Sequence, residues 1–171
     1  VTHGAQQFAE LNSLGLAGIF GNLTLKAVQF GVSIETLSKA TDQTRVQLYK
    51  DAISGNRNFV DVQEEFLSKT RAFADENDLT KILGREKGFS AAAGIMSTAK
   101  KTGLNDEDVQ DVSKSMVKDF KILNKLLGVS GEQYNAEIES LNNLEGSQNA
   151  LIDATEEQRK AYLINNTQIY K

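Results

Sequence analysis

The sequence predicts an all-α protein, a multi-helix bundle of helix-turn-helix units with one or two long helices. The first observation is that none of the 171 residues is Pro, although ordinary usage would give about eight or nine. Pro inside a helix costs about 3 kcal/mol, so its absence is expected of a chain that is helical nearly throughout. The second observation is that apolar residues recur at helical spacing and strand patterns are almost absent.

Composition excludes several classes of function. The chain has 19 basic and 23 acidic residues and a net charge of −4, whereas a protein that wraps nucleic acid needs a basic surface. It has no Cys, and its only His is His3. Thiolate chemistry, disulfides, zinc sites and imidazole catalysis are therefore not expected, and the sequence suggests no cofactor, metal or small-molecule substrate.

Residues 1–32 form a separate, glycine-rich apolar segment in the predicted organisation, and residues 33–171 form the helical bundle domain. Glycines can let two backbones approach closely or keep a segment flexible. A membrane span needs about 20 apolar residues, and here polar side chains interrupt the run. The candidates for close packing or membrane contact are Gly15, Gly18, Ile19, Phe20 and Gly21.

Within the bundle, apolar periodicity predicts helices over 34–53, 59–74, 91–101, 106–127, 134–144 and 156–169. The clearest is 106–127, whose apolar residues step by 3, 4, 4, 3 and 4 positions and so form one stripe along a rod of roughly 30 Å. We predict that this stripe is an interface with other helices or with copies of the chain. Its residues are Val109, Val112, Met116, Phe120, Leu123 and Leu127.

A recurring phrase of glycine, apolar residue and small polar residue predicts the junctions between helices. Glycine can end a helix in the left-handed conformation, and Ser or Asn can cap the next one. Two further pairs, Ser130 with Gln133 and Thr155 with Gln158, have the spacing of a capping box. The four phrases are Gly31-Val32-Ser33, Gly88-Phe89-Ser90, Gly103-Leu104-Asn105 and Gly128-Val129-Ser130.

Carboxylates are the only abundant candidates for catalysis. Neighbouring acids such as Glu64 and Glu65 could form an acid and base pair, but adjacent residues on a helix point about 100° apart. We interpret these acids, together with the Glu137/Glu139 pair and the Asp106-Glu107-Asp108 run, as solvated helix faces. We predict a helix break over 84–88, a cap over 75–78, and cations that suit the helix dipole at 100–101.

The junction phrases resemble those of bacteriophage tail tape measure proteins. The resemblance rests on residues 31–40, 103–109 and 128–134, on the Gln- and Asn-rich stretch 158–166 and on the apolar glycine-rich stretch near the start. It implies a long helical protein inside the tail tube that sets tail length, contacts the hub and leaves with the DNA. Some members carry peptidoglycan-hydrolase domains, but no catalytic residue of such a domain can be matched here.

From this resemblance we expect a non-enzymatic fragment of a virion protein, located in the tail interior after synthesis in the host cytoplasm. Its start at Val1 without a signal segment fits a fragment or a processed product. The expected partners are the tail hub, the tail tube and copies of itself, with transient membrane contact and no specific nucleic-acid binding. The alternatives are a soluble helical adaptor that binds a partner helix, a membrane-active protein that uses residues 14–32, and a muramidase-like enzyme that uses paired Glu.

Overall fold

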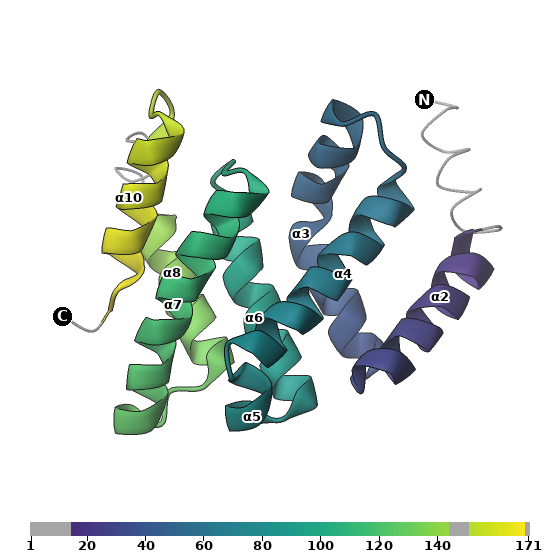
Figure 1. Cartoon of the computed structure of the whole chain (residues 1–171), viewed down its shortest axis with the longest axis horizontal. Coiled ribbons are helices and arrows are strands. Elements are labelled where there is room, and N and C mark those ends of the chain that lie inside the picture. The colour runs from purple at the N-terminus through teal and green to yellow at the C-terminus, as the bar shows by residue number, and fades with distance from the viewer. Residues whose placement is uncertain (1–14, 144–150, 170–171) are drawn as a thin grey trace.

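The computed structural model describes residues 15–143 and 151–169, with side chains from residue 23 onward. This part of the chain is helical and contains no strand, which confirms the predicted all-α multi-helix bundle (Figure 1). The helices are α2 (Gly15–Phe30), α3 (Ile34–Ser54), α4 (Phe59–Glu76), α5 (Leu79–Leu83), α6 (Arg85–Lys100), α7 (Asp106–Leu127), α8 (Gly131–Asn142) and α10 (Glu156–Thr167).

Helix α6 is the centre of the bundle. It contacts α3, α4, α5, α7 and α8, while α10 packs on α7 and α8 and α2 packs on α3 (Figure 1). A helix that is covered on all sides must be apolar or small all round. The run Ala91-Ala92-Ala93-Gly94 meets this condition, and all four residues are buried. Small side chains allow five neighbouring helices to approach one axis.

One hydrophobic core joins the helices. The end of α2 contributes to it through Leu23, Ala27 and Phe30, and the ring of Phe30 stacks on that of Phe89 with centroids 5.9 Å apart. Within the described residues, the end of the 1–32 segment therefore shares its core with the bundle. The largest fully buried side chains are Leu37, Leu48, Leu67, Phe73, Leu79, Phe89, Ile95, Met96, Met116, Phe120, Tyr134 and Ile138.

Three of the four predicted junctions have the expected geometry. At each, the glycine has a positive φ, between 67° and 79°, and the Ser or Asn two residues later accepts a hydrogen bond from the backbone N–H three residues ahead. Both predicted capping boxes are also present. The glycine and cap pairs are Gly31 with Ser33, Gly103 with Asn105 and Gly128 with Ser130.

The fourth predicted junction, Gly88-Phe89-Ser90, is wrong. Gly88 lies inside α6, and the break falls at Gly84, which has φ 92°. The reason for a glycine at 88 is space, because a Cβ there would lie 2.7 Å from the carbonyl oxygen of Leu79. The predicted cap after α4 is placed correctly, but Asp78 makes no side-chain cap hydrogen bond and adopts φ 64°.

Candidate functional site

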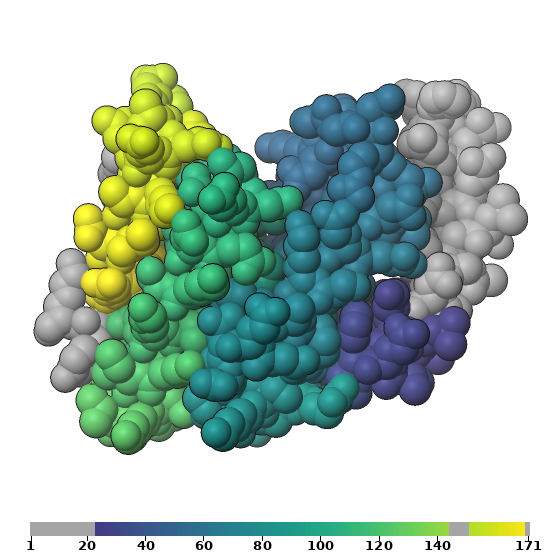
Figure 2. Space-filling model, in the orientation of Figure 1, coloured from purple at the N-terminus to yellow at the C-terminus, as the bar shows by residue number. Residues whose placement is uncertain are grey.

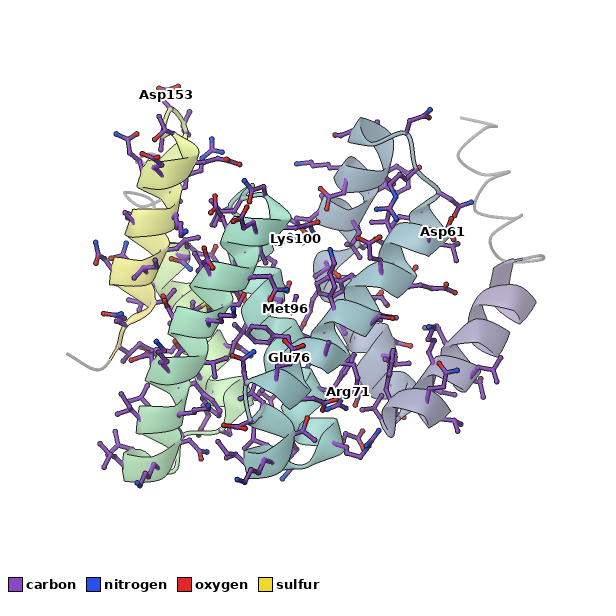
Figure 3. All side chains as sticks on the ribbon, viewed as in Figure 1. Asp61, Arg71, Glu76, Met96, Lys100 and Asp153 are labelled. Carbon is purple, nitrogen blue, oxygen red and sulfur yellow. The ribbon has the colours of Figure 1, made fainter. Side chains whose placement is uncertain are left out.

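A notch between the α3–α4 pair and the α7–α10 pair is the main hollow of the visible face (Figure 2). It leads to a cavity of about 350 Å³ between α3, α4, α6 and α7, close to the lower limit of small-molecule sites. Its floor is apolar and includes Leu48, Phe66 and Met96, all of which are buried. Figure 3 shows Met96 and Lys100 near the middle of the molecule, with Lys100 closer to the notch.

Charged side chains of alternating sign follow the rim of this cavity. Arg57 contacts Glu65 at 2.6 Å, and Glu65 contacts Lys69 at 3.1 Å. Lys69 then reaches Asp106 at the start of α7, 3.4 Å away. The row thus runs from the loop before α4, along α4, and across to α7.

Lys100, at the end of α6, completes the row. Its ammonium group binds Asp106 at 3.3 Å and also contacts Asp51 of α3, and its side chain is only 8% exposed. A buried ammonium group without counter-ions would be strongly unfavourable. Two carboxylates from helices on opposite sides of the notch therefore pair with this lysine and connect the two halves of the molecule.

Two rim carboxylates, Glu65 and Asp106, are held in the ionised form. Hydrogen bonds from Arg57 and Lys69 lower the pKa of Glu65 to about 2. Burial opposes ionisation of Asp106, but the charges of Lys100 and Lys69 outweigh it and lower the pKa of that residue too. A general acid needs a pKa near the working pH. The pKa of Glu65 is lowered and not raised, so this side chain is suited to an ion pair.

A second buried cation joins the other end of the bundle. The guanidinium of Arg71 donates to the carbonyl oxygens of Phe30 and Arg85, both at 3.0 Å, and to Asp75 at 2.9 Å. It also contacts Thr80 and is 8% exposed. This one side chain on α4 thereby connects α2, α5 and α6. Its hydrogen bonds stabilise the packing of these helices.

The sequence did not reveal Lys100 or Arg71 as central residues. The sequence predicts Lys100 as a last-turn cation that suits the helix dipole, a position it does occupy, but its carboxylate partners lie on α3 and α7. For Arg71 the available signal is its place among apolar neighbours in the buried stripe of α4. A long charged side chain within such a stripe predicts burial with partners, although not which partners.

The apolar stripe of α7 lies in the core. Five of the six predicted interface residues, Val109, Val112, Met116, Phe120 and Leu123, are at most 6% exposed, because α6, α8 and α10 of the same chain cover them. These five residues therefore pack against other helices of the same chain, the first of the two predicted alternatives, and are not at the surface of this fold. Only Leu127, 73% exposed, is available to a partner.

The predicted packing or membrane candidates lie in the first turns of α2. The backbone there is helical, but the side chains of Gly15, Gly18, Ile19, Phe20 and Gly21 lie outside the described residues, so both roles stay predictions. In the part of the chain that the structure describes, no helix has the length and apolar character needed to cross a membrane.

The remaining acids are distributed over several helices. Asp108 and Asp111 share Lys160 at 3.3 and 2.8 Å, and Glu139 pairs with Lys101 at 3.4 Å. Among residues 15–143 and 151–169, no group of three or more His, Cys, Asp or Glu side chains is placed to hold a metal ion. The ion pairs of Lys160 connect α10 to α7, and that of Lys101 connects the end of α6 to α8.

Comparison with known proteins gives no relative. No family model, no curated protein and no solved structure matches this chain.

Proposed function

We propose that this chain is a non-enzymatic structural segment of a bacteriophage virion, similar in role to part of a tail tape measure protein. Its proposed place is the tail interior, and its proposed partners are the tail tube, the tail hub and copies of itself. The proposal begins from the resemblance in the junction phrases. It concerns a mechanical role in tail assembly and genome ejection.

The observation that supports the proposal most is that the ionisable groups around the cavity pair with one another. Glu65, Lys69, Lys100 and Asp106 neutralise one another across three helices, and their pairing fixes one half of the bundle to the other. Ion pairs that join three helices around this cavity favour one arrangement of the bundle. A segment that must keep its shape in a crowded tube needs a bundle with one fixed arrangement.

The experiment is detection of the chain in particles. An antiserum raised against the purified chain is applied to phage virions from the organism that encodes it, before and after DNA ejection. We expect a signal in purified virions that is protected from protease while the tail is intact and is lost on ejection. An antiserum against the tail tube is the matched control, because its signal stays after ejection. Absence of the chain from purified virions would overturn the proposal.

The enzymatic alternative has its own test. Wild-type protein is incubated with purified peptidoglycan beside the Glu64→Ala/Glu65→Ala variant. We expect no release by either protein, because hydrogen bonds from Arg57 and Lys69 hold Glu65 ionised. Release by the wild type that the variant loses would replace the structural proposal by a hydrolase.

A helical adaptor is the second candidate, and the cavity itself favours it. An apolar floor with a charged rim is the geometry in which a groove binds an amphipathic helix. A partner helix would have to displace the ion pairs of Lys100 to reach Met96, which is 2% exposed. A chain that stays monomeric and is absent from virions would favour this candidate.

Membrane contact by residues 14–32 is a separate proposal. Liposome flotation of the wild type against Ile19→Asp tests it. Flotation of the wild type that the variant loses supports membrane contact, and failure of the wild type to float refutes it.

A further inference from the structure

The charged side chains of α7 are acidic near its start and are lysines from residue 114 onward, apart from Asp119. Four lysines, Lys114, Lys118, Lys121 and Lys125, follow one another at intervals of 4, 3 and 4 residues, and this spacing places them on one face of the helix. Lys114, Lys118 and Lys125 are exposed, and Lys121 is 32% exposed beside Asp78. Among the described residues, no ion pair involves the three exposed lysines. We call this set the lysine face.

The helix dipole does not account for the lysine face. The dipole favours cations only within the last turn of a helix, and α7 ends at Leu127. Lys114 and Lys118 lie more than one turn before that end. Ile122 and Leu126, which are 39% and 59% exposed, directly follow Lys121 and Lys125 and so point about 100° away from them. The lysine face is therefore positively charged, and exposed apolar side chains lie on the neighbouring side of α7.

The opposite end of the molecule has the complementary composition. Glu107 is exposed at the start of α7, and Asp153, Glu156 and Glu157 are exposed at the start of α10. The two helix starts are joined, because the Asn105 side chain donates to Glu156 at 3.1 Å. Figure 3 shows Asp153 at this end of the molecule, far from the end of α7. We call these four acids the acidic end.

An apolar residue accompanies the acidic end as well. Ile152, in the turn before α10, is 68% exposed. The acidic end thus has four acids and an exposed aliphatic side chain, against the four lysines of the lysine face and the exposed Ile122 and Leu126 on the neighbouring side of α7. The two surfaces are complementary in charge.

We propose that the lysine face of one copy binds the acidic end of a second copy of this chain. The two surfaces differ, so the contact is head-to-tail and generates a row or a ring instead of a closed two-fold dimer. Complementary charges steer such a contact and fix its register. The inference rests on the proposed structural function, for which it names the surface and the partner.

The observations favour a second copy over an anionic membrane. Asp78 lies 3.5 Å from Lys121 and places negative charge within the lysine face, and the chain as a whole carries −4. An extended anionic surface cannot avoid Asp78, whereas the separate acids of a second copy can pair with Lys114, Lys118 and Lys125. The net charge of −4 opposes both partners and weakens either contact. The patch is small beside the roughly 20 to 30 residues per side of a stable complex, so the contact should be weak and depend on concentration.

The experiment is sedimentation velocity of the full chain over about a hundredfold range of concentration, at about 50 mM and about 500 mM salt. At low salt the wild type should reach at least double the 18.7 kDa of one chain, and at high salt it should return to that mass. Lys118→Glu/Lys125→Glu and Glu156→Lys/Glu157→Lys should each stay at the monomer mass. The matched control Lys39→Glu/Lys50→Glu, on α3, changes the net charge by the same amount as the α7 variant and should associate like the wild type.

Mixing the two reversed variants separates a lost contact from lost folding. In the mixture the unchanged acidic end of the α7 variant meets the unchanged lysine face of the α10 variant, and the introduced glutamates meet the introduced lysines. The mixture should therefore regain the mass that neither variant reaches alone. A monomeric wild type at every concentration, or association that the α7 variant leaves unchanged, overturns the inference. Lysine-dependent binding to phosphatidylserine vesicles by a monomeric wild type would also overturn it. Detection in virions is measured independently, so its failure is distinguishable from failure of the head-to-tail contact.

Discussion

Gly88→Ala should destabilise the protein even though alanine is the better helix former. Gly88 lies within α6 and has no positive φ. An added Cβ would lie 2.7 Å from the Leu79 carbonyl oxygen and 2.8 Å from the backbone nitrogen of Thr80. These are backbone atoms at the start of α5, so no side-chain rotation can relieve the overlap. Helix α6 must move away from α5.

The expected magnitude is the difference of two effects. Replacing glycine by alanine inside a helix stabilises by about 1 kcal/mol, whereas overpacking costs about 1–3 kcal/mol. The new Cβ of α6 would overlap with backbone atoms of α5, and α6 is covered on all sides, so neither helix can move easily. The cost of overpacking therefore lies in the upper part of that range. We therefore expect a net loss of about 2 kcal/mol, which for a domain of this size lowers the melting temperature by roughly 4–8 °C.

Urea unfolding followed by far-UV circular dichroism measures this loss. The midpoint should fall while the slope stays unchanged, since only the stability is altered. Gly94→Ala is the matched control in the same helix. Its Cβ would meet the side-chain amide of Asn135, which can swing aside at the expense of a long 3.4 Å hydrogen bond to Ala91. Gly94→Ala should thus stay close to the wild type. A Gly88→Ala variant as stable as the wild type, or as Gly94→Ala, would refute the reasoning.

Three further outcomes follow from the same structure. Phe120→Ala should lower the free energy of unfolding by about 3–5 kcal/mol, and Leu127→Ala should lower it by less than about 0.5 kcal/mol. The reason is that Phe120 is fully buried and Leu127 is 73% exposed. Similar losses for the two variants in urea unfolding would show that α7 is not packed as described. Tyr134→Phe should cost about 1–3 kcal/mol, since its buried hydroxyl donates to the Thr167 carbonyl oxygen at 2.9 Å, and an unchanged urea midpoint would contradict this. Glu65 has a pKa of about 2 in the fold against an ordinary 4.5, so its contribution to stability is complete above about pH 4.5 and is lost as the pH falls toward 2. Glu65→Gln should flatten that part of the stability curve, and a curve with the wild-type slope would count against the ion pairs.

The sequence predicted the fold class and most helix ends because both depend on local chemistry. Periodicity places α7 over the observed residues, and a glycine followed by a Ser or Asn cap ends one helix and starts the next at three junctions. These signals lie within a few residues of one another along the chain. Gly88 defeats the same rule because its reason is a neighbour in space, the backbone of Leu79 in another helix.

The cavity could not be predicted for a related reason. Its ion pairs join α3 to α6 and α4 to α7 through Lys100 and Lys69, and these partners are 49 and 37 positions apart in the sequence. The helix dipole alone explains a lysine near the end of a helix. The sequence therefore gives no signal for the contacts that Lys100 makes with carboxylates of distant helices.

The stripe of α7 shows what periodicity can and cannot decide. An apolar stripe on a helix establishes only that something covers it, because burial of that area lowers the free energy whether the cover belongs to the same chain or to another. Here α6, α8 and α10 provide the cover, so the stripe has no capacity left for a partner. The opposite face is then the part of α7 that can bind something. Its lysines carry positive charge that the described residues leave largely unpaired, in a chain of net charge −4. A partner that neutralises this face must bring acids in a fixed arrangement, and the exposed start of α10 in a second copy offers them.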